Sequence, residues 1–336
     1  MKSGRLAVVL GCLGVLVAAA AGCGMRSYAG IVSQPARPSV ALSMSSVDGR
    51  TRLAKVRLVQ RLRRPPKVVI FGGSRAMKFD PGDIRRRTGL SGLNLAVTHA
   101  RPEDTWALLN LLHARFPRAR FRFLWVIHCD EFIRRPIDAV VLLDPKLSRF
   151  FPRRLVEAQL PAAVRRARGE EKTAEIDIQQ HGPLKYAPNG YVVKGFFSGD
   201  KRPRKSHSAA LAVNIRKELW IYATHPVTPY RQSVRYFRKD LAMMVTLAAA
   251  RPVLVAAPFD TRIYAATLHH GWGARHRRLL ALLAGLRRHD RFSFLDLSRA
   301  TAHGFVPSDF YDGIHLTPRA AMRVVDLVMQ RFPHAL

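Results

Sequence analysis

The stretch Lys67-Val-Val-Ile-Phe-Gly-Gly-Ser-Arg-Ala-Met-Lys-Phe-Asp-Pro81 decides how the chain folds. Its run of apolar β-formers, Val68 to Phe71, predicts a buried strand, and two glycines end that strand directly before Ser74. Asp80 and Pro81 then supply the N-cap and the first position of a short helix. Because open α/β sheets bind their ligands at the carboxyl ends of the strands, we expect the Ser74 hydroxyl to lie at that edge.

Strands and helices alternate along the chain from this stretch onward. Strands are expected at 67–71, 91–97, 121–127, 252–258 and 292–297, and helices at 81–87, 102–116, 229–251, 275–288 and 318–332. This alternation predicts an α/β fold with a doubly wound, mostly parallel sheet. Residues 136–228 break the rhythm, and we interpret them as a cap-like insertion beside the ligand-binding edge.

The composition is that of a globular protein with a strongly basic charge balance. The chain has 336 residues, of which 48% are apolar, and 56 Lys and Arg against 23 Asp and Glu give a net charge of +33. Such a surface favours anionic partners, namely an anionic membrane surface or an envelope polymer. The alternative is a basic surface that is only solvated. No motif of a specific nucleic-acid-binding module is present in the sequence.

The N-terminus has the features of an export signal. Basic residues precede the apolar run 6–21, which ends in Ala20-Ala21-Gly22-Cys23. We interpret 1–23 as a lipoprotein signal peptide in which Cys23 carries the lipid, with an uncleaved signal anchor or ordinary secretion as alternatives. Each of them places the protein outside the cytoplasm, and the first two anchor it to the cell membrane.

A tether and a basic helix follow, at 24–64, before the main domain at 65–336. We expect the helical part, 50–64, to pack on the domain and to present a basic outer face. Of the three cysteines, Cys12 lies in the apolar run and Cys23 just after it, so Cys129 is the one thiol of the domain and no internal disulfide is expected. No metal or cofactor is expected.

The stretch Asp309-Phe-Tyr-Asp-Gly-Ile-His-Leu-Thr-Pro318 contains a histidine and an aspartate that could activate the Ser74 hydroxyl. Thr317 and Pro318 fit the start of the last helix, so Asp312 and His315 lie in the loop before it. An Asp-x-x-His step allows the carboxylate to hold one nitrogen of the imidazole. The other nitrogen is then free to take the proton of a serine hydroxyl, here Ser74.

With these residues the chain resembles the SGNH/GDSL hydrolase superfamily of serine esterases and acyl hydrolases, which have a flavodoxin-like doubly wound sheet. Gly73-Ser74 matches the nucleophile block of the family, and Asp312-x-x-His315 matches its acid/base block. The resemblance covers about 67–130 and 229–332, and the insertion is unmatched. It implies that Ser74 is the nucleophile, His315 the general base and Asp312 the residue that orients it.

The other two blocks of the family are only partly kept. In the second, Asn94-Leu-Ala-Val-Thr-His99, the asparagine is retained while Ala96 and His99 replace glycines. In the third, Ile127-His-Cys-Asp130, Cys129 stands where the family has the asparagine that donates to the oxyanion. The resemblance therefore implies an oxyanion hole built from the backbone amides of Ser74 and His99, with the Asn94 amide as a further candidate. Loss of one donor costs roughly 3–4 kcal/mol of transition-state stabilisation.

Two functions are consistent with these residues. The first is an exported, membrane-anchored serine hydrolase or acyltransferase that forms an acyl-enzyme with an ester, such as an O-acylated envelope polysaccharide. The second is a non-catalytic SGNH-like envelope protein that binds anionic polymer or assists its assembly. The group His128-Cys129-Asp130 is interpreted as a buried strand end rather than a metal or thiol site. His269, His270 and His276 are expected at the surface.

Overall fold

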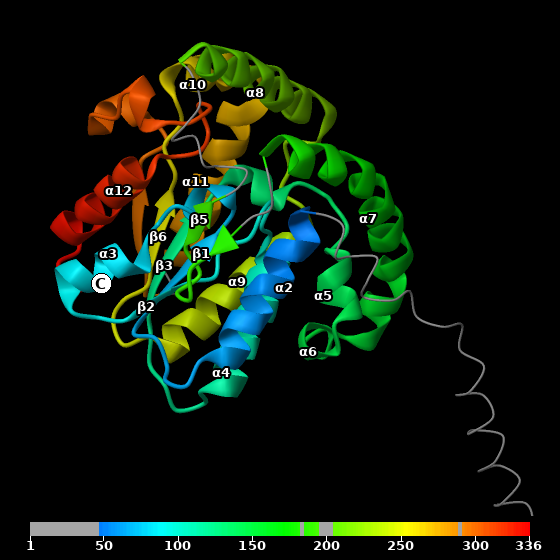
Figure 1. Ribbon diagram of the computed structural model, residues 1–336, viewed down its shortest axis with the longest axis vertical. Helices are drawn as coiled ribbons and strands as arrows, with labels where there is room; N and C mark the ends of the chain where they lie inside the picture. Colours follow the sequence, from blue (N-terminus) through cyan, green and yellow to red (C-terminus); the bar gives the residue numbers. More distant parts are fainter. Residues whose placement is uncertain (1–46, 182–184, 195–203, 288–290) are drawn as a thin grey trace, which may run out of the picture. The chain divides into compact units, whose positions relative to one another are not determined.

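A five-stranded parallel sheet forms the centre of the fold (Figure 1). Its strand order is β2-β1-β3-β6-β7, and every neighbouring pair is parallel. The strands are β1 (Val68–Gly72), β2 (Gly92–Asn94), β3 (Arg122–Ile127), β6 (Val253–Ala256) and β7 (Ser293–Asp296). Taken in chain order within this sheet, the arrangement is 2-1-3-4-5, an order found in doubly wound sheets, in which the switch point lies between the first and third strands. The predicted α/β class and parallel sheet are confirmed.

The structure is a computed structural model that describes residues 47–181, 185–194, 204–287 and 291–336. The described residues all belong to one unit, Val40–Leu336. The predictions for the signal segment 1–23, for Cys23 and for the tether before residue 47 lie outside the described residues. Within those residues, no helix combines the length and the apolar character needed to cross a membrane.

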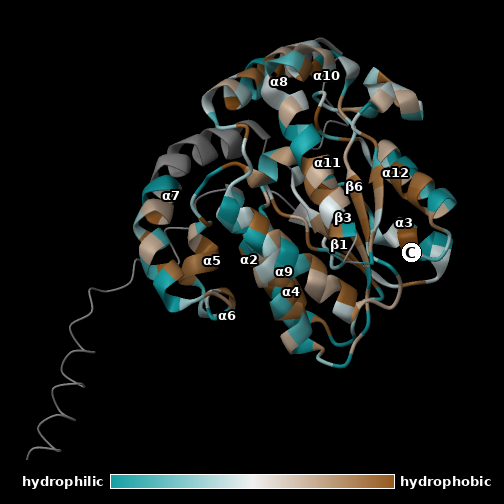
Figure 2. Ribbon diagram, turned by 180° about the vertical axis from the view of Figure 1, so that it is seen from behind, coloured by the Kyte–Doolittle hydropathy of each residue, from teal (hydrophilic) through white to brown (hydrophobic). Residues whose placement is uncertain are grey.

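Helices cover both faces of the sheet. Four pack on one face, namely α2 (Val47–Arg61), α4 (Pro102–Arg115), α9 (Arg231–Leu247) and α11 (Gly273–Arg287), whereas α3 (Pro81–Thr88) and α12 (Pro318–Arg331) pack on the other. Side chains of a strand alternate between the two layers, so Val69 and Phe71 face the first and Val68 and Ile70 the second. Because both faces are covered, the central strands β1, β3 and β6 are almost entirely hydrophobic (Figure 2).

The helix starts expected from sequence are present. The Asp80 carboxylate accepts a hydrogen bond from the Gly82 amide at 2.7 Å, and Pro81 is the first residue of α3. At α12 the Thr317 hydroxyl accepts from the Ala320 amide at 3.3 Å. These caps satisfy amides that have no partner within the helix, and they fix where the preceding loops end.

The basic helix α2 packs on the domain as predicted, but its expected basic outer face is incomplete. Arg52 and Lys55 are buried. Arg52 forms a two-pronged ion pair with Asp104, with both N–O distances at 2.7 Å. The Lys55 ammonium donates to the Asn94 and Gly190 carbonyl oxygens at 2.8 and 2.6 Å. These inward basic residues have acceptors on the domain, and such acceptors cannot be recognised from the spacing within the helix.

The insertion contributes to three different places rather than forming one cap. Helices α5 (Ala139–Leu143), α6 (Pro145–Ser148) and α7 (Arg153–His181) lie beside α2 and α4. Strands β4 (Lys185–Tyr186) and β5 (Val192–Lys194) form a hairpin whose turn lies against β2. There the backbone N–H of Asn94 donates to the Asn189 carbonyl at 2.8 Å. Helix α8 (Arg204–Thr224) packs against α10 (Thr261–Thr267). Within the described residues of the insertion, only those of α8 line the cavity described below.

Candidate active site

The Ser74 hydroxyl is presented by a tight turn at the end of β1. Gly72 has φ = +143°, and a Cβ at this position would lie 2.5 Å from the Val126 carbonyl oxygen, so only glycine fits between β1 and β3. A 3-10 turn, η2 (Ser74–Ala76), follows directly. Ser74 is its first residue, and the first amides of such a turn have no partner within it. The turn therefore holds both the hydroxyl and the amide of Ser74 at the carboxyl end of the sheet.

Asp312 and His315 lie in the loop before α12, as predicted. One Asp312 carboxylate oxygen accepts from the Ile314 and His315 amides at 3.0 and 2.9 Å, which folds the loop around the carboxylate. The loop is tied to its surroundings by two further bonds. The Asp260 amide donates to the Gly313 carbonyl at 2.9 Å, and the Asn214 side chain of α8 donates to the Asp312 carbonyl at 3.1 Å.

The structure brings the three predicted catalytic side chains into one hydrogen-bonded row. The other Asp312 oxygen lies 2.7 Å from His315 Nδ1, and His315 Nε2 lies 2.8 Å from the Ser74 hydroxyl oxygen. Burial alone would raise the pKa of Asp312, but the His315 imidazole and the two backbone amides lower it well below its usual value. An ionised Asp312 fixes the proton of a neutral His315 on Nδ1. Nε2 is then the acceptor for the Ser74 proton.

A cavity of about 310 Å³ opens in front of Ser74 and His315. It is small for a ligand pocket and suits a small ester group. Its walls come from the ends of β1, β2 and β3, from the loop before α12 and from α8, which contributes Asn214, Lys217, Glu218 and Ile221. The serine and the histidine are therefore accessible to a ligand while the aspartate lies behind them.

Asn94 does not face this cavity. Its side-chain amide donates to the Ala76 and Phe79 carbonyls at 2.8 and 2.9 Å, and its side-chain oxygen accepts from the Ala96 amide at 2.9 Å. Both N–H groups and the oxygen of the Asn94 side chain are thus bonded to backbone groups, and these bonds hold the segment after Ser74 in place. Its candidacy as an oxyanion donor was wrong, because these bonds turn the amide toward the backbone of the nucleophile turn.

His99 lies on the cavity wall in a backbone conformation that suits glycine. Its φ is +44°, which is uncommon for a residue with a side chain and lies in the left-handed region that favours glycine. The ring Nδ1 lies 3.1 Å from the Asp48 carboxylate, so Asp48 stabilises the imidazole in this position. The next amide, that of Ala100, lies 3.9 Å from the place where a Gly73 Cβ would be. The segment after β2 therefore runs alongside the turn that carries Ser74.

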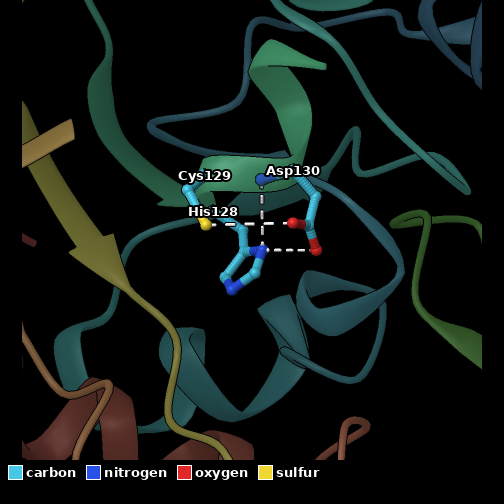
Figure 3. A group of neighbouring side chains, drawn as sticks. All are labelled: His128, Cys129 and Asp130. Carbon is cyan, nitrogen blue, oxygen red and sulfur yellow. Dashed lines mark hydrogen bonds and ion pairs between the residues drawn. The ribbon is translucent and has the colours of Figure 1, made fainter. Parts of the chain in front are cut away.

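The third block supplies no side-chain amide to the cavity. Cys129 is buried and does not belong to the described residues that line this cavity. His128 and Asp130 point toward each other, with Nδ1 2.8 Å from the carboxylate (Figure 3). The His128 Nε2 atom accepts from the Trp272 indole N–H at 3.2 Å, so the neutral ring carries its proton on Nδ1 and donates it to the Asp130 carboxylate. The backbone nitrogen of Asp130, 3.3 Å from Nδ1, is then a close neighbour of this N–H group and not its donor.

The ligand atoms of His128, Cys129 and Asp130 lie within 4.8 Å of one another, as a metal site would require. Both ring nitrogens of His128 are already engaged, however, and burial together with Asp130 raises the pKa of the Cys129 thiol well above its usual value. A neutral thiol is a poor metal ligand and a poor nucleophile. These residues fit a buried hydrogen-bonded cluster better than a metal site or a thiol site.

Several charged residues of the cavity wall were not recognised from the sequence, among them Arg75, Glu131 and Glu218. Arg75, which follows Ser74, is buried, and its Nη2 atom lies 3.8 Å from the Asp130 carboxylate. Burial raises the pKa of Glu131 well above its usual value, and burial with Asp130 nearby raises that of Glu218 to about 7. Charged residues are normally exposed, so the sequence offers no reason to place these side chains in a buried wall. The one available signal was the position of Arg75 directly after Ser74.

His276 was expected at the surface and is instead buried. It stacks on Trp272 with ring centroids 4.8 Å apart, and its Nε2 atom lies 2.9 Å from Asp296 and 3.3 Å from the Ser298 hydroxyl. Aspartate and serine contact the same ring nitrogen, so this group cannot relay a proton as Ser74, His315 and Asp312 can. His269 and His270 are exposed, as predicted.

A scan of the chain against protein-family models finds no match, and a search of curated protein sequences finds none either. The arguments about function below therefore rest on the geometry of the site and on the motifs of the sequence.

Proposed function

We propose that the protein is a serine hydrolase of the SGNH type that acts on an ester through an acyl-enzyme at Ser74. The observation that carries the proposal is the continuous row of hydrogen bonds from Asp312 through His315 to the Ser74 hydroxyl, at 2.7 and 2.8 Å. The strand order and the position of Ser74 after β1, beside the switch point of the sheet, also fit this class.

In the first half-reaction the Ser74 oxygen adds to the ester carbonyl carbon, and its proton passes to His315 Nε2. The carbonyl oxygen becomes an oxyanion, for which the amides of Ser74 and of the segment after β2 are the backbone donors. The intermediate then expels the alcohol, which takes the proton from His315. Water, or the hydroxyl of an acceptor sugar, repeats these steps on the acyl-enzyme.

The substrate class follows from the cavity and from the N-terminal sequence. A cavity of about 310 Å³ accommodates a short acyl group such as acetyl. If the protein is exported and anchored through Cys23, the available esters are those of the envelope, and O-acylated polysaccharide is the class that we favour. The net charge of +33 would then hold the protein near anionic polymer or lipid headgroups.

A fluorophosphonate probe tests the proposal, because it modifies a serine only where a base and an oxyanion hole activate it. Wild type is expected to be labelled and to hydrolyse p-nitrophenyl acetate, and Ser74→Ala is expected to lose both activities. Ser298→Ala is the matched control, because Ser298 is also bonded to a histidine, at 3.3 Å, and should leave both readouts unchanged. Absence of labelling in wild type would refute the proposal and favour a non-catalytic envelope protein.

A further inference from the structure

The region around Ser74 contains a buried cation that the proposed mechanism has not yet used. Arg75 lines the same cavity as Ser74 and His315, and only about 8% of its surface is exposed. Its Nη1 atom has no hydrogen-bond partner among the described residues, although it is buried. A buried, unpaired N–H of a guanidinium costs free energy unless a ligand satisfies it.

The guanidinium is held in place from two sides. Its central carbon lies 4.0 Å from the centroid of the Phe259 ring, and its Nη2 atom lies 3.8 Å from the Asp130 carboxylate. Asp130 is itself fixed, because it accepts from His128 and, at 3.1 Å, from the Tyr222 hydroxyl. Burial alone would raise the pKa of Asp130, but His128 and Arg75 lower it well below its usual value, so it remains an anion. This arrangement leaves Nη1 as the unused donor of a positioned cation.

The catalytic cavity lacks the side-chain donor that such a cation would replace. Cys129 occupies the third-block position and lies outside the described lining of the cavity, and the Asn94 amide is bonded to the Ala76 and Phe79 carbonyls. The other buried arginine of the wall, Arg101, uses both terminal nitrogens on the Arg135 carbonyl, Glu103 and Ser233, and only its Nε atom has no partner among the described residues. Among the described residues of the wall, Arg75 is therefore the buried arginine that keeps a terminal nitrogen without a partner.

We propose that the Arg75 guanidinium is a catalytic residue of this site, and that its Nη1–H group donates to the oxyanion in place of the asparagine amide of the family. The inference rests on the proposed function. When the Ser74 oxygen bonds to the carbonyl carbon and the proton moves to His315, the C=O π electrons become the negative charge on oxygen. Arg75 stabilises that charge with a charge-assisted hydrogen bond, and it releases the oxygen when the C=O bond re-forms and the alcohol leaves.

The test measures kcat and KM for p-nitrophenyl acetate, a neutral ester, with wild type, Arg75→Ala, Arg75→Lys and Arg323→Met. Loss of one oxyanion donor lowers kcat by about 10²- to 10³-fold, so we expect this loss for Arg75→Ala with KM changed by less than about threefold. Guanidinium chloride at millimolar concentration should raise the kcat of Arg75→Ala at least tenfold. Arg75→Lys, which keeps the charge, should retain more activity than Arg75→Ala.

Arg323→Met is the matched control, because Arg323 also lies 4.0 Å from an aspartate, Asp309, and 5.1 Å from a phenylalanine ring, that of Phe305, but outside the cavity. It should keep kcat within about twofold. A kcat of Arg75→Ala within fivefold of wild type, or a loss that guanidinium does not restore in a folded variant, would overturn the inference. If Arg75→Ala does not fold, the same criterion of fivefold applies to Arg75→Met, which removes the charge but keeps an apolar side chain, and to its rate of fluorophosphonate labelling.

Two other outcomes separate the possible failures. A large rise in KM that occurs only with an anionic ester, such as a p-nitrophenyl hemisuccinate, would show that Arg75 binds a substrate anion instead. Wild type that is neither labelled nor active would refute the proposed function, and the role of Arg75 with it. Active wild type with an unaffected Arg75→Ala variant would refute only the role of Arg75.

Discussion

Replacing Asn94 with alanine should cost the protein a large part of its stability. The side chain is fully buried and makes three hydrogen bonds to backbone groups, two as donor to Ala76 and Phe79 and one as acceptor from Ala96, all between 2.8 and 2.9 Å. Each bond contributes about 0.5–1.5 kcal/mol, and an unpaired buried group costs about 1–3 kcal/mol. Three such bonds contribute about 1.5–4.5 kcal/mol, and the buried groups left unpaired put the expected loss at the upper end of this range, at about 3–5 kcal/mol. A typical total stability is about 5–15 kcal/mol.

Urea denaturation followed by circular dichroism measures this loss. With a slope of about 2–3 kcal/mol per molar urea, the midpoint should fall by about 1–2 M. Asn110→Ala is the matched control, because the Asn110 amide makes one bond, to the Trp106 carbonyl of its own helix, and alanine is a good helix former. It should change stability by less than about 1 kcal/mol. An Asn94→Ala variant of unchanged stability with kcat reduced 100-fold would refute the reasoning, because it would identify Asn94 as an oxyanion donor.

Three further outcomes are expected. Asp312→Asn should lower kcat by about 10³- to 10⁴-fold, measured with saturating ester, because the amide favours the wrong tautomer of His315. Burial, with Arg75 nearby, lowers the pKa of His128 to about 4, so the stability that the neutral ring provides is present above pH 6.5 and is lost as the pH falls toward 4. Urea midpoints of wild type should therefore fall more steeply over this range than those of His128→Gln. Cys129→Ser should keep kcat within about twofold, and iodoacetamide should not inactivate the wild type, because burial keeps the Cys129 thiol protonated.

The sheet and the hydrogen-bonded row of Asp312, His315 and Ser74 could be predicted because local sequence determines both. The strand before Ser74 and the caps at Asp80 and Thr317 are signals within a few residues, and the Asp312-x-x-His315 step needs only one loop. Their meeting follows from topology, since parallel strands and the loops after them share one edge of the sheet.

Interactions between distant segments could not be predicted in this way. Lys55 can be buried because the Asn94 and Gly190 carbonyl oxygens accept hydrogen bonds from its ammonium group. Gly190 lies in the insertion, far from Lys55 in the sequence. His276 is buried because Asp296 and Trp272 meet it from two sides. In each case a polar residue that would be assigned to the surface is buried with a partner that only the fold supplies.

The charges around the cavity suggest that its electrostatics change near neutral pH. Besides Arg75, the described wall holds Arg101, Arg135 and Lys217 as cations, and Asp48, Asp130, Glu131 and Glu218 as acids. The pKa of Glu131 is raised well above its usual value and that of Glu218 to about 7, so the wall is net positive below pH 7 and favours an oxyanion.

Ionisation of Glu218 above pH 7 adds a negative charge to this wall, and we expect kcat to level off or fall there while hydroxide-driven background hydrolysis rises. Glu218→Gln keeps the shape of the side chain and removes this titration, so its kcat should stay higher than that of wild type above about pH 7.5 relative to the values at pH 6. The measurement is a pH profile of kcat from 5.5 to 9 for both proteins. Identical profiles would show that the charge of Glu218 does not act on the reacting oxygen, and that the field at Ser74 comes from the residues nearer to it.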